Sequence, residues 1–152
     1  MRKQAGFTLI ELAIVLVIIG LLLGGVLKGQ ELINSAKVKN MATDFRNVPV
    51  YIYGYQDKFK ALPGDDASAV AHVSALAGHV GDGNGKIDGV WNTTTASDEA
   101  TYFWEHVRLA GLAPGSTVYA ATAFYPTNAD GGRVGISTDV PIIGLPGAYF
   151  MC

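Results

Sequence analysis

The pattern of hydrophobic positions divides the chain into one uninterrupted apolar run and a longer mixed remainder. The run covers residues 7–27, follows a short basic leader at residues 1–6 and contains a single charged residue, Glu11. At about 1.5 Å per residue, a helix of this length can cross the roughly 30 Å hydrocarbon core of a bilayer. A cleaved secretory signal usually has a shorter apolar region, of about 7–15 residues. The pattern therefore predicts a retained membrane-spanning helix.

Residues 28–60 continue the helical pattern with a narrower apolar stripe. Apolar residues recur at steps of four and three, the spacing that places side chains on one face of a helix. They are Met41, Phe45, Val48, Ile52, Tyr55 and Phe59. Charged and polar residues occupy the other faces. We expect one long helix whose first half is apolar all round and whose second half packs under a folded head.

The remaining residues, 61–152, have the composition of a small globular head. Short helices are predicted at residues 67–77 and from a cap at Ser97 or Asp98 to about Ala110, because each range follows residues that cap or turn the chain. Four further segments have strand-like patterns. They are residues 116–125, 133–137, 142–145 and 148–151. The expected fold class is α+β, a long amino-terminal helix packed against a head with short helices and a small antiparallel sheet.

A glycine-rich segment of the head, VGDGNGKID at residues 80–88, matches the middle of an EF-hand calcium loop. In this interpretation Asp82 and Asn84 supply side-chain oxygens. Lys86 supplies its backbone carbonyl, and Asp88 acts through a water molecule. The segment therefore predicts a Ca2+ site.

Two positions depart from that motif. Val80 stands at its first ligand position and Trp91 at the position of its bidentate acid. Because Ca2+ takes about 6–8 oxygens, other acids of the head would have to complete the shell. The candidates are Asp65, Asp66 and Glu99. The alternative interpretation is a solvated glycine-rich turn that binds no metal.

Charge and motif content bear on several classes of function. The net charge is −2, and removal of the leader's two cations, Arg2 and Lys3, would bring it to −4. That balance argues against general nucleic-acid binding. The sequence has no nucleophile-elbow or zinc-protease spacing, so we expect no catalytic residues and no enzyme. The leader cations favour a cytoplasmic amino terminus and an external head.

The start of the apolar run, KQAGFTLIE at residues 3–11, resembles the class III signal of the type IV pilin family. The shared features are a glycine at the boundary between charged and apolar residues, an aromatic residue next to it and a TLIEL core. The resemblance implies that a membrane-embedded prepilin peptidase cuts between Gly6 and Phe7 and N-methylates Phe7. It also implies that Glu11, fifth in the mature chain, is the acidic residue on which the family's assembly depends.

The resemblance further implies a pilin fold and a structural subunit that polymerises helically with copies of itself. The implied divisions are a leader (1–6), a transmembrane or filament-core helix (7–27), its amphipathic continuation (28–60) and the head (61–152). Implied partners are the prepilin peptidase, an inner-membrane assembly platform and the lipid bilayer before assembly. The implied location is the bacterial inner membrane, followed by an extracellular pilus.

Two alternatives remain open. One is a pseudopilin of a type II secretion or DNA-uptake system, which would form a periplasmic pseudopilus; some major pseudopilins bind calcium in the head. The other is a membrane-anchored calcium-binding or adhesive module that does not polymerise. Many pilins close the carboxyl-terminal region with a disulfide, but this chain has a single cysteine, Cys152. We expect that the sequence is truncated there.

Overall fold

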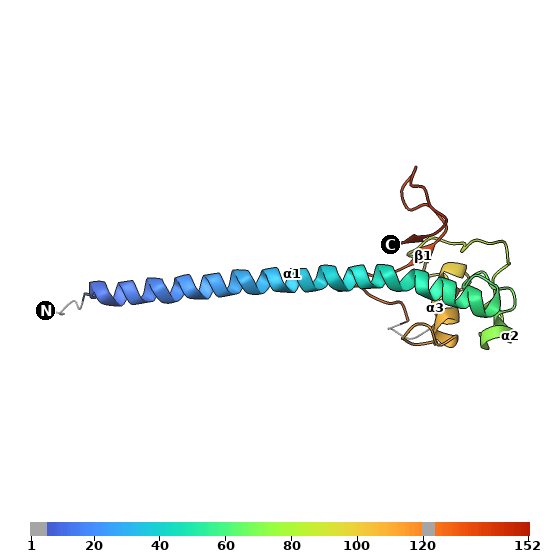
Figure 1. The fold of residues 1–152 in the computed structure, drawn as a ribbon, viewed down its shortest axis with the longest axis horizontal. Coiled ribbons are helices and arrows are strands. Elements are labelled where there is room, and N and C mark those ends of the chain that lie inside the picture. The colour runs from blue at the N-terminus through green and yellow to red at the C-terminus, as the bar shows by residue number, and fades with distance from the viewer. Residues whose placement is uncertain (1–5, 120–123) are drawn as a thin grey trace. The chain divides into compact units, whose positions relative to one another are not determined.

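The computed structural model describes residues 6–119 and 124–152 (Figure 1). Along the chain the elements are α1 (Leu9–Phe59), α2 (Ala69–Val73), α3 (Glu99–Leu109), β1 (Ile136–Ser137) and β2 (Phe150–Met151). The chain forms two compact units, Met1–Lys39 and Asn40–Cys152, which are described separately. A long amino-terminal helix together with a head of short helices and an antiparallel strand pair confirms the predicted α+β class.

In the first unit, α1 presents apolar side chains on every side. The helix is long and apolar enough to cross a membrane, and none of its most apolar stretch is buried. Its length agrees with the prediction of one helix that continues past the apolar run. Apolar surface on this scale is unfavourable in water, so lipid or other protein chains must cover it.

The core of the head forms between the distal part of α1 and α3. Val48 and Ile52 of α1 pack in one cluster with Phe103 and Val107 of α3 and with Ile136 of β1. The predicted stripe is thus confirmed in these later turns of α1. One turn earlier the stripe is not buried, because Phe45 is exposed. Periodicity identifies the buried face of a helix, whereas the extent of its cover depends on the tertiary structure.

The two predicted short helices differ in their agreement with the structure. α3 begins directly after Asp98 and ends at Leu109, as predicted. α2 has five residues rather than the range 67–77, because Ser74 adopts a left-handed conformation with φ of 59° and ends it.

The sheet is smaller than the sequence pattern indicated. β1 and β2 pair antiparallel, with Ile136 opposite Met151 and Ser137 opposite Phe150. Thus only parts of the predicted strands 133–137 and 148–151 pair, together with an isolated bridge between Thr127 and Arg133.

Two strand predictions fail within the described residues. Residues 142–145 form a turn instead of a strand, because Gly144 has a positive φ and breaks the extended conformation. In the predicted strand 116–125, residues 120–123 lie outside the described part of the chain. The other residues of that range form no strand, and the side chain of Arg108 donates hydrogen bonds to the carbonyls of Ser116 and Phe124.

All three histidines form hydrogen bonds within the head. His106 is fully buried, and its Nδ1 accepts a hydrogen bond from the Gly64 N–H at 3.1 Å. Its Nε2 lies 3.0 Å from the His79 carbonyl, so a neutral ring protonated at Nε2 satisfies both contacts. Burial lowers the pKa of His106, which favours this neutral form. His72 pairs with Asp66, and His79 pairs with Glu105.

Candidate functional site

The predicted cleavage site lies directly before α1. Residues 6–8 are not helical, and α1 begins at Leu9. Phe7 is exposed, and, apart from the chain neighbours of Gly6, no atom of the described residues lies within 4 Å of the position that a Cβ on Gly6 would occupy. The Gly6–Phe7 peptide bond is therefore in an open segment that a protease can bind without unwinding the helix.

Glu11 lies in the first turn of α1 and forms reciprocal hydrogen bonds with Thr8. The Thr8 backbone N–H donates to Glu11 Oε2 at 2.8 Å, and the Thr8 hydroxyl donates to the same oxygen at 2.7 Å. In return the Glu11 N–H donates to Thr8 Oγ1 at 3.3 Å. This is a capping box, which pairs N–H groups that have no partner inside the helix. The Thr8 cap was not predicted from the sequence, although a threonine three residues before a glutamate is the signal for this motif.

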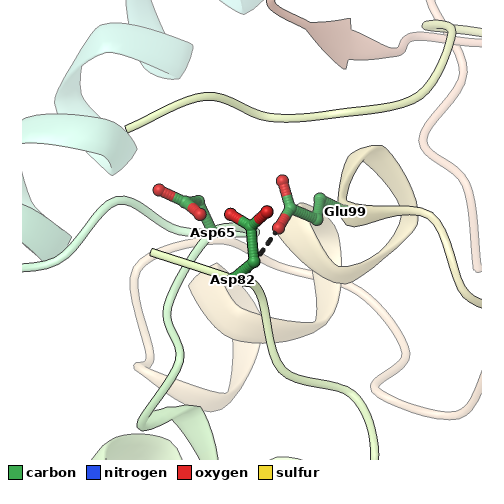
Figure 2. Close-up of side chains that lie close together, drawn as sticks. All are labelled: Asp65, Asp82 and Glu99. Carbon is green, nitrogen blue, oxygen red and sulfur yellow. Dashed lines mark hydrogen bonds between the residues drawn. The ribbon is translucent and has the colours of Figure 1, made fainter. Parts of the chain in front are cut away.

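In the head, three carboxylates from separate segments meet, and we call them the acidic cluster (Figure 2). Asp65 lies on the turn after α1, Asp82 on the glycine-rich loop and Glu99 in the first turn of α3. Oxygen atoms from the three side chains lie within 4.8 Å of one another. Asp65 and Glu99 are buried, and Asp82 is exposed.

The two buried acids also fix the glycine-rich loop. Asp65 accepts hydrogen bonds from the consecutive backbone N–H groups of residues 83–85, at 2.7 to 3.0 Å. Glu99 accepts one from the Asp82 N–H and one from the Asp88 N–H, each at 2.9 Å. These bonds explain why two carboxylates are buried although no cationic side chain of the described residues pairs with them.

Burial raises the pKa of both Asp65 and Glu99, and the backbone hydrogen bonds oppose that rise. The neighbouring charges of Asp65 and Asp82 raise the pKa of Glu99 further. The acidic cluster therefore concentrates negative charge in a partly buried site, where a bound cation would favour the ionised carboxylates. Its donors are all oxygens, the ligands that Ca2+ prefers.

Side-chain hydrogen bonds join three of the ligands predicted from the sequence, Asp82, Asn84 and Asp88. Asn84 Nδ2 donates to Asp82 Oδ2 at 2.9 Å and to Asp88 Oδ2 at 3.1 Å. Asn84 Oδ1 accepts a hydrogen bond from the Lys86 N–H at 2.8 Å, which occupies the oxygen proposed as a ligand. Asp82 is the predicted ligand that joins the acidic cluster.

The structure also distinguishes the three acids proposed to complete the shell. Asp65 and Glu99 lie in the cluster. Asp66 does not, because its carboxylate accepts a hydrogen bond from the Tyr55 hydroxyl and pairs with His72, each at 2.7 Å. The adjacent acids Asp65 and Asp66 thus have different surroundings, which sequence alone does not distinguish.

Comparison with known proteins identifies the amino-terminal segment. Residues 1–27 match the family model described as the prokaryotic N-terminal methylation motif. No curated protein and no solved structure matches the chain. The matched residues cover the leader and the apolar part of α1, and they support a pilin-like class III signal, a prepilin form, methylation and a transmembrane helix. The motif points to a structural protein.

Proposed function

We propose that this chain is the precursor of a type IV pilin-like subunit that polymerises into a filament through its amino-terminal helix. The observation that carries the proposal is the methylation motif at residues 1–27, which continues directly into a helix with no buried part in its most apolar stretch. In the precursor the bilayer would cover this apolar surface. In the filament the same helices of neighbouring copies would cover it.

The amino-terminal geometry fits this role. The class III signal is cut before Phe7, and the open segment before Leu9 leaves that bond accessible. The leader cations favour a cytoplasmic leader, so the head would lie outside the inner membrane. A prepilin peptidase would remove the leader, and an assembly platform would add subunits to the filament. The completed filament would then extend from the cell surface.

We predict that the mature protein begins with N-methylated Phe7. Amino-terminal peptide analysis and intact-mass measurement of protein from native cells will identify this end. Gly6→Leu should accumulate as uncleaved precursor, because a side chain is added at the peptidase's cleavage position. Gly20→Leu, the same change within the helix, should be cleaved normally. Retention of Met1 in the wild type, or cleavage well after Leu27, would contradict the proposed function.

A second proposal concerns the head. We propose that the acidic cluster binds Ca2+ and that the ion stabilises the glycine-rich loop. Three carboxylates from three segments converge there, and a hard divalent cation would neutralise charge that the backbone N–H groups only partly offset. Such a site would join the loop to both α3 and the turn after α1.

Calcium should therefore raise the melting temperature of the full-length protein in detergent. A ligand selective for the native state adds about 2.7 kcal/mol at 100 times its dissociation constant, which corresponds to several degrees for a domain of this size. Asp82→Asn should remove most of this shift, and Asp57→Asn, on an exposed part of α1, should keep it. Equal melting temperatures of the wild type in calcium and in chelator would refute the Ca2+ proposal. Residues 80–88 would then be a glycine-rich turn that binds no metal.

A further inference from the structure

The side chain of His106, on α3, joins two other segments of the head. Its Nδ1 accepts a hydrogen bond from the Gly64 N–H, on the turn after α1, and its Nε2 donates to the His79 carbonyl. A backbone N–H can only donate and a carbonyl can only accept, so both bonds require the neutral ring with its proton on Nε2. A second proton, on Nδ1, would place two donors against each other in a site with no access to solvent.

Both partners of the ring are held in place. A Cβ at Gly64 would lie 2.8 Å from the Glu99 carbonyl oxygen, so the turn after α1 is pressed against the backbone of α3. His79 is fixed on the other side, because its ring pairs with the buried carboxylate of Glu105. The charged form of His106 therefore fits only if the turn after α1 moves away from α3.

The groups around the ring do not compensate for the lost hydrogen bond. The titratable groups that face the ring or act on it through their charge are Tyr55, Tyr102, Glu105, Asp66 and His79. Burial raises the pKa of both tyrosines, which stack on the ring and stay neutral. The two carboxylates favour a charged ring, but each pairs with another histidine. Burial outweighs them and lowers the pKa of His106.

We propose that His106 is an acid-sensitive latch that holds the turn after α1 against α3. A proton from solvent binds Nδ1, the nitrogen that otherwise accepts the Gly64 hydrogen bond, and the charged ring favours the conformation in which that bond is broken. Gly64 directly precedes Asp65, whose carboxylate holds the backbone N–H groups of residues 83–85. Opening of the latch therefore also loosens the glycine-rich loop. The latch requires neither calcium nor filament assembly.

The direction of the pH dependence follows from the two states of the ring. In the unfolded chain a histidine titrates at about pH 6.5, and in the folded head the pKa of His106 is lower. Well above that pH both states are neutral at this residue, and it adds no pH dependence. As the pH falls, the unfolded state binds the proton first. The folding constant then decreases by up to about tenfold per pH unit, until the folded ring also titrates.

Urea titrations of the full-length protein in detergent and chelator measure this decrease. His106→Asn is the comparison, because the asparagine oxygen can accept from the Gly64 N–H and takes up no proton. Relative to this variant, the folding constant of the wild type should fall at least about threefold from about pH 7.5 to about pH 5.5. His72→Asn is the matched control. Relative to it the wild type should show no such fall, because Asp66 accepts from His72 Nδ1 in either charge state.

Nitrogen-15 NMR of the histidine-labelled wild type tests the latch even where His106→Asn does not fold. His72→Asn and His79→Asn assign the other two rings by the loss of their signals. The His106 ring should be neutral, with its proton on Nε2, at about pH 6.5. Solvent exchange of the Gly64 amide should accelerate as that ring takes up its proton. A fall below threefold relative to His106→Asn, a ring that is half charged at that pH, or protonation without faster Gly64 exchange would each overturn the proposal.

Discussion

Cells that contain Glu11→Val as the sole subunit are expected to process the protein normally and to assemble at least about tenfold fewer filaments. Valine suits the apolar surroundings, so membrane insertion should be at least as efficient as in the wild type. Cleavage should also persist, because the Gly6–Phe7 bond lies outside α1. The defect should therefore appear at assembly alone.

The reason we expect for that defect is the amine that the proposed cleavage would create. The new amino terminus on Phe7 would be four residues from Glu11, and in the proposed filament the amine of one copy would pair with the carboxylate of the next. In a low-dielectric filament core an unpaired charge costs several kcal/mol, so registers that separate amine and carboxylate are penalised. Glu11 would thus determine the register of neighbouring helices more than the strength of their contact.

The capping box with Thr8 requires a control, because Glu11→Val also removes the cap. Glu11→Gln keeps a side chain that can complete the box while it removes the charge. Both variants should fail to assemble if the charge sets the register. Thr8→Val removes the cap hydroxyl and should assemble far better than either.

Electron microscopy of shed fibres, beside a blot for processed protein, measures all of these variants. Normal fibre numbers from processed Glu11→Val would show that apolar packing alone sets the register. Assembly of Glu11→Gln without assembly of Glu11→Val would assign the role to the cap.

The parts of the fold that sequence predicts are those determined locally. The apolar run needs no partner within the chain to be helical, and the stripe that includes Val48 and Ile52 identifies the face of α1 that the head covers. The start of α3 is likewise marked by Asp98 and by the acid that follows it. Each of these signals is carried by residues that are close together in the sequence.

The remaining features depend on contacts between distant segments. Asp65 and Glu99 come together only because the turn after α1 and the start of α3 hold the same glycine-rich loop. The predicted strand at residues 142–145 fails for a different reason. Its apolar residues suit a strand, but Gly144 and the flanking prolines favour a turn. No strand of the described residues pairs with this segment, so no strand pairing opposes the turn.

Arg108 is the clearest case of structure that the pattern did not indicate, and its replacement should have the largest effect on stability. Its guanidinium is buried and donates to three carbonyls. Nε donates to Pro114 O at 3.0 Å, and Nη1 donates to Ser116 O at 2.8 Å and to Phe124 O. Gly115 leaves room for it, since a Cβ at that position would lie 2.6 Å from Arg108 Nε. One side chain thereby connects Pro114, Ser116 and Phe124, none of which lies in a strand.

We predict that Arg108→Met lowers the free energy of unfolding by about 3–6 kcal/mol, because it keeps an apolar stem but leaves one buried and two partly buried carbonyl contacts without their charged donor. The cost of about 1–3 kcal/mol per carbonyl applies in full only where water does not replace the donor. Since small domains have about 5–15 kcal/mol in total, the head would be close to unfolding. The stability of Arg108→Lys should fall between that of the wild type and that of Arg108→Met, because an ammonium group is too compact to reach three carbonyls at once.

Urea titration of the full-length protein in detergent, followed by tryptophan emission, measures these differences, since Trp104 lies beside the Arg108 guanidinium. Arg46→Met is the matched control on the exposed face of α1, and it should change stability by no more than about 0.5 kcal/mol. Gly115→Ala, which crowds the guanidinium from the other side, should reproduce part of the loss. An Arg108→Met protein within about 1 kcal/mol of the wild type would show that water replaces the guanidinium at these carbonyls, and that the segment after α3 is held by its apolar contacts instead.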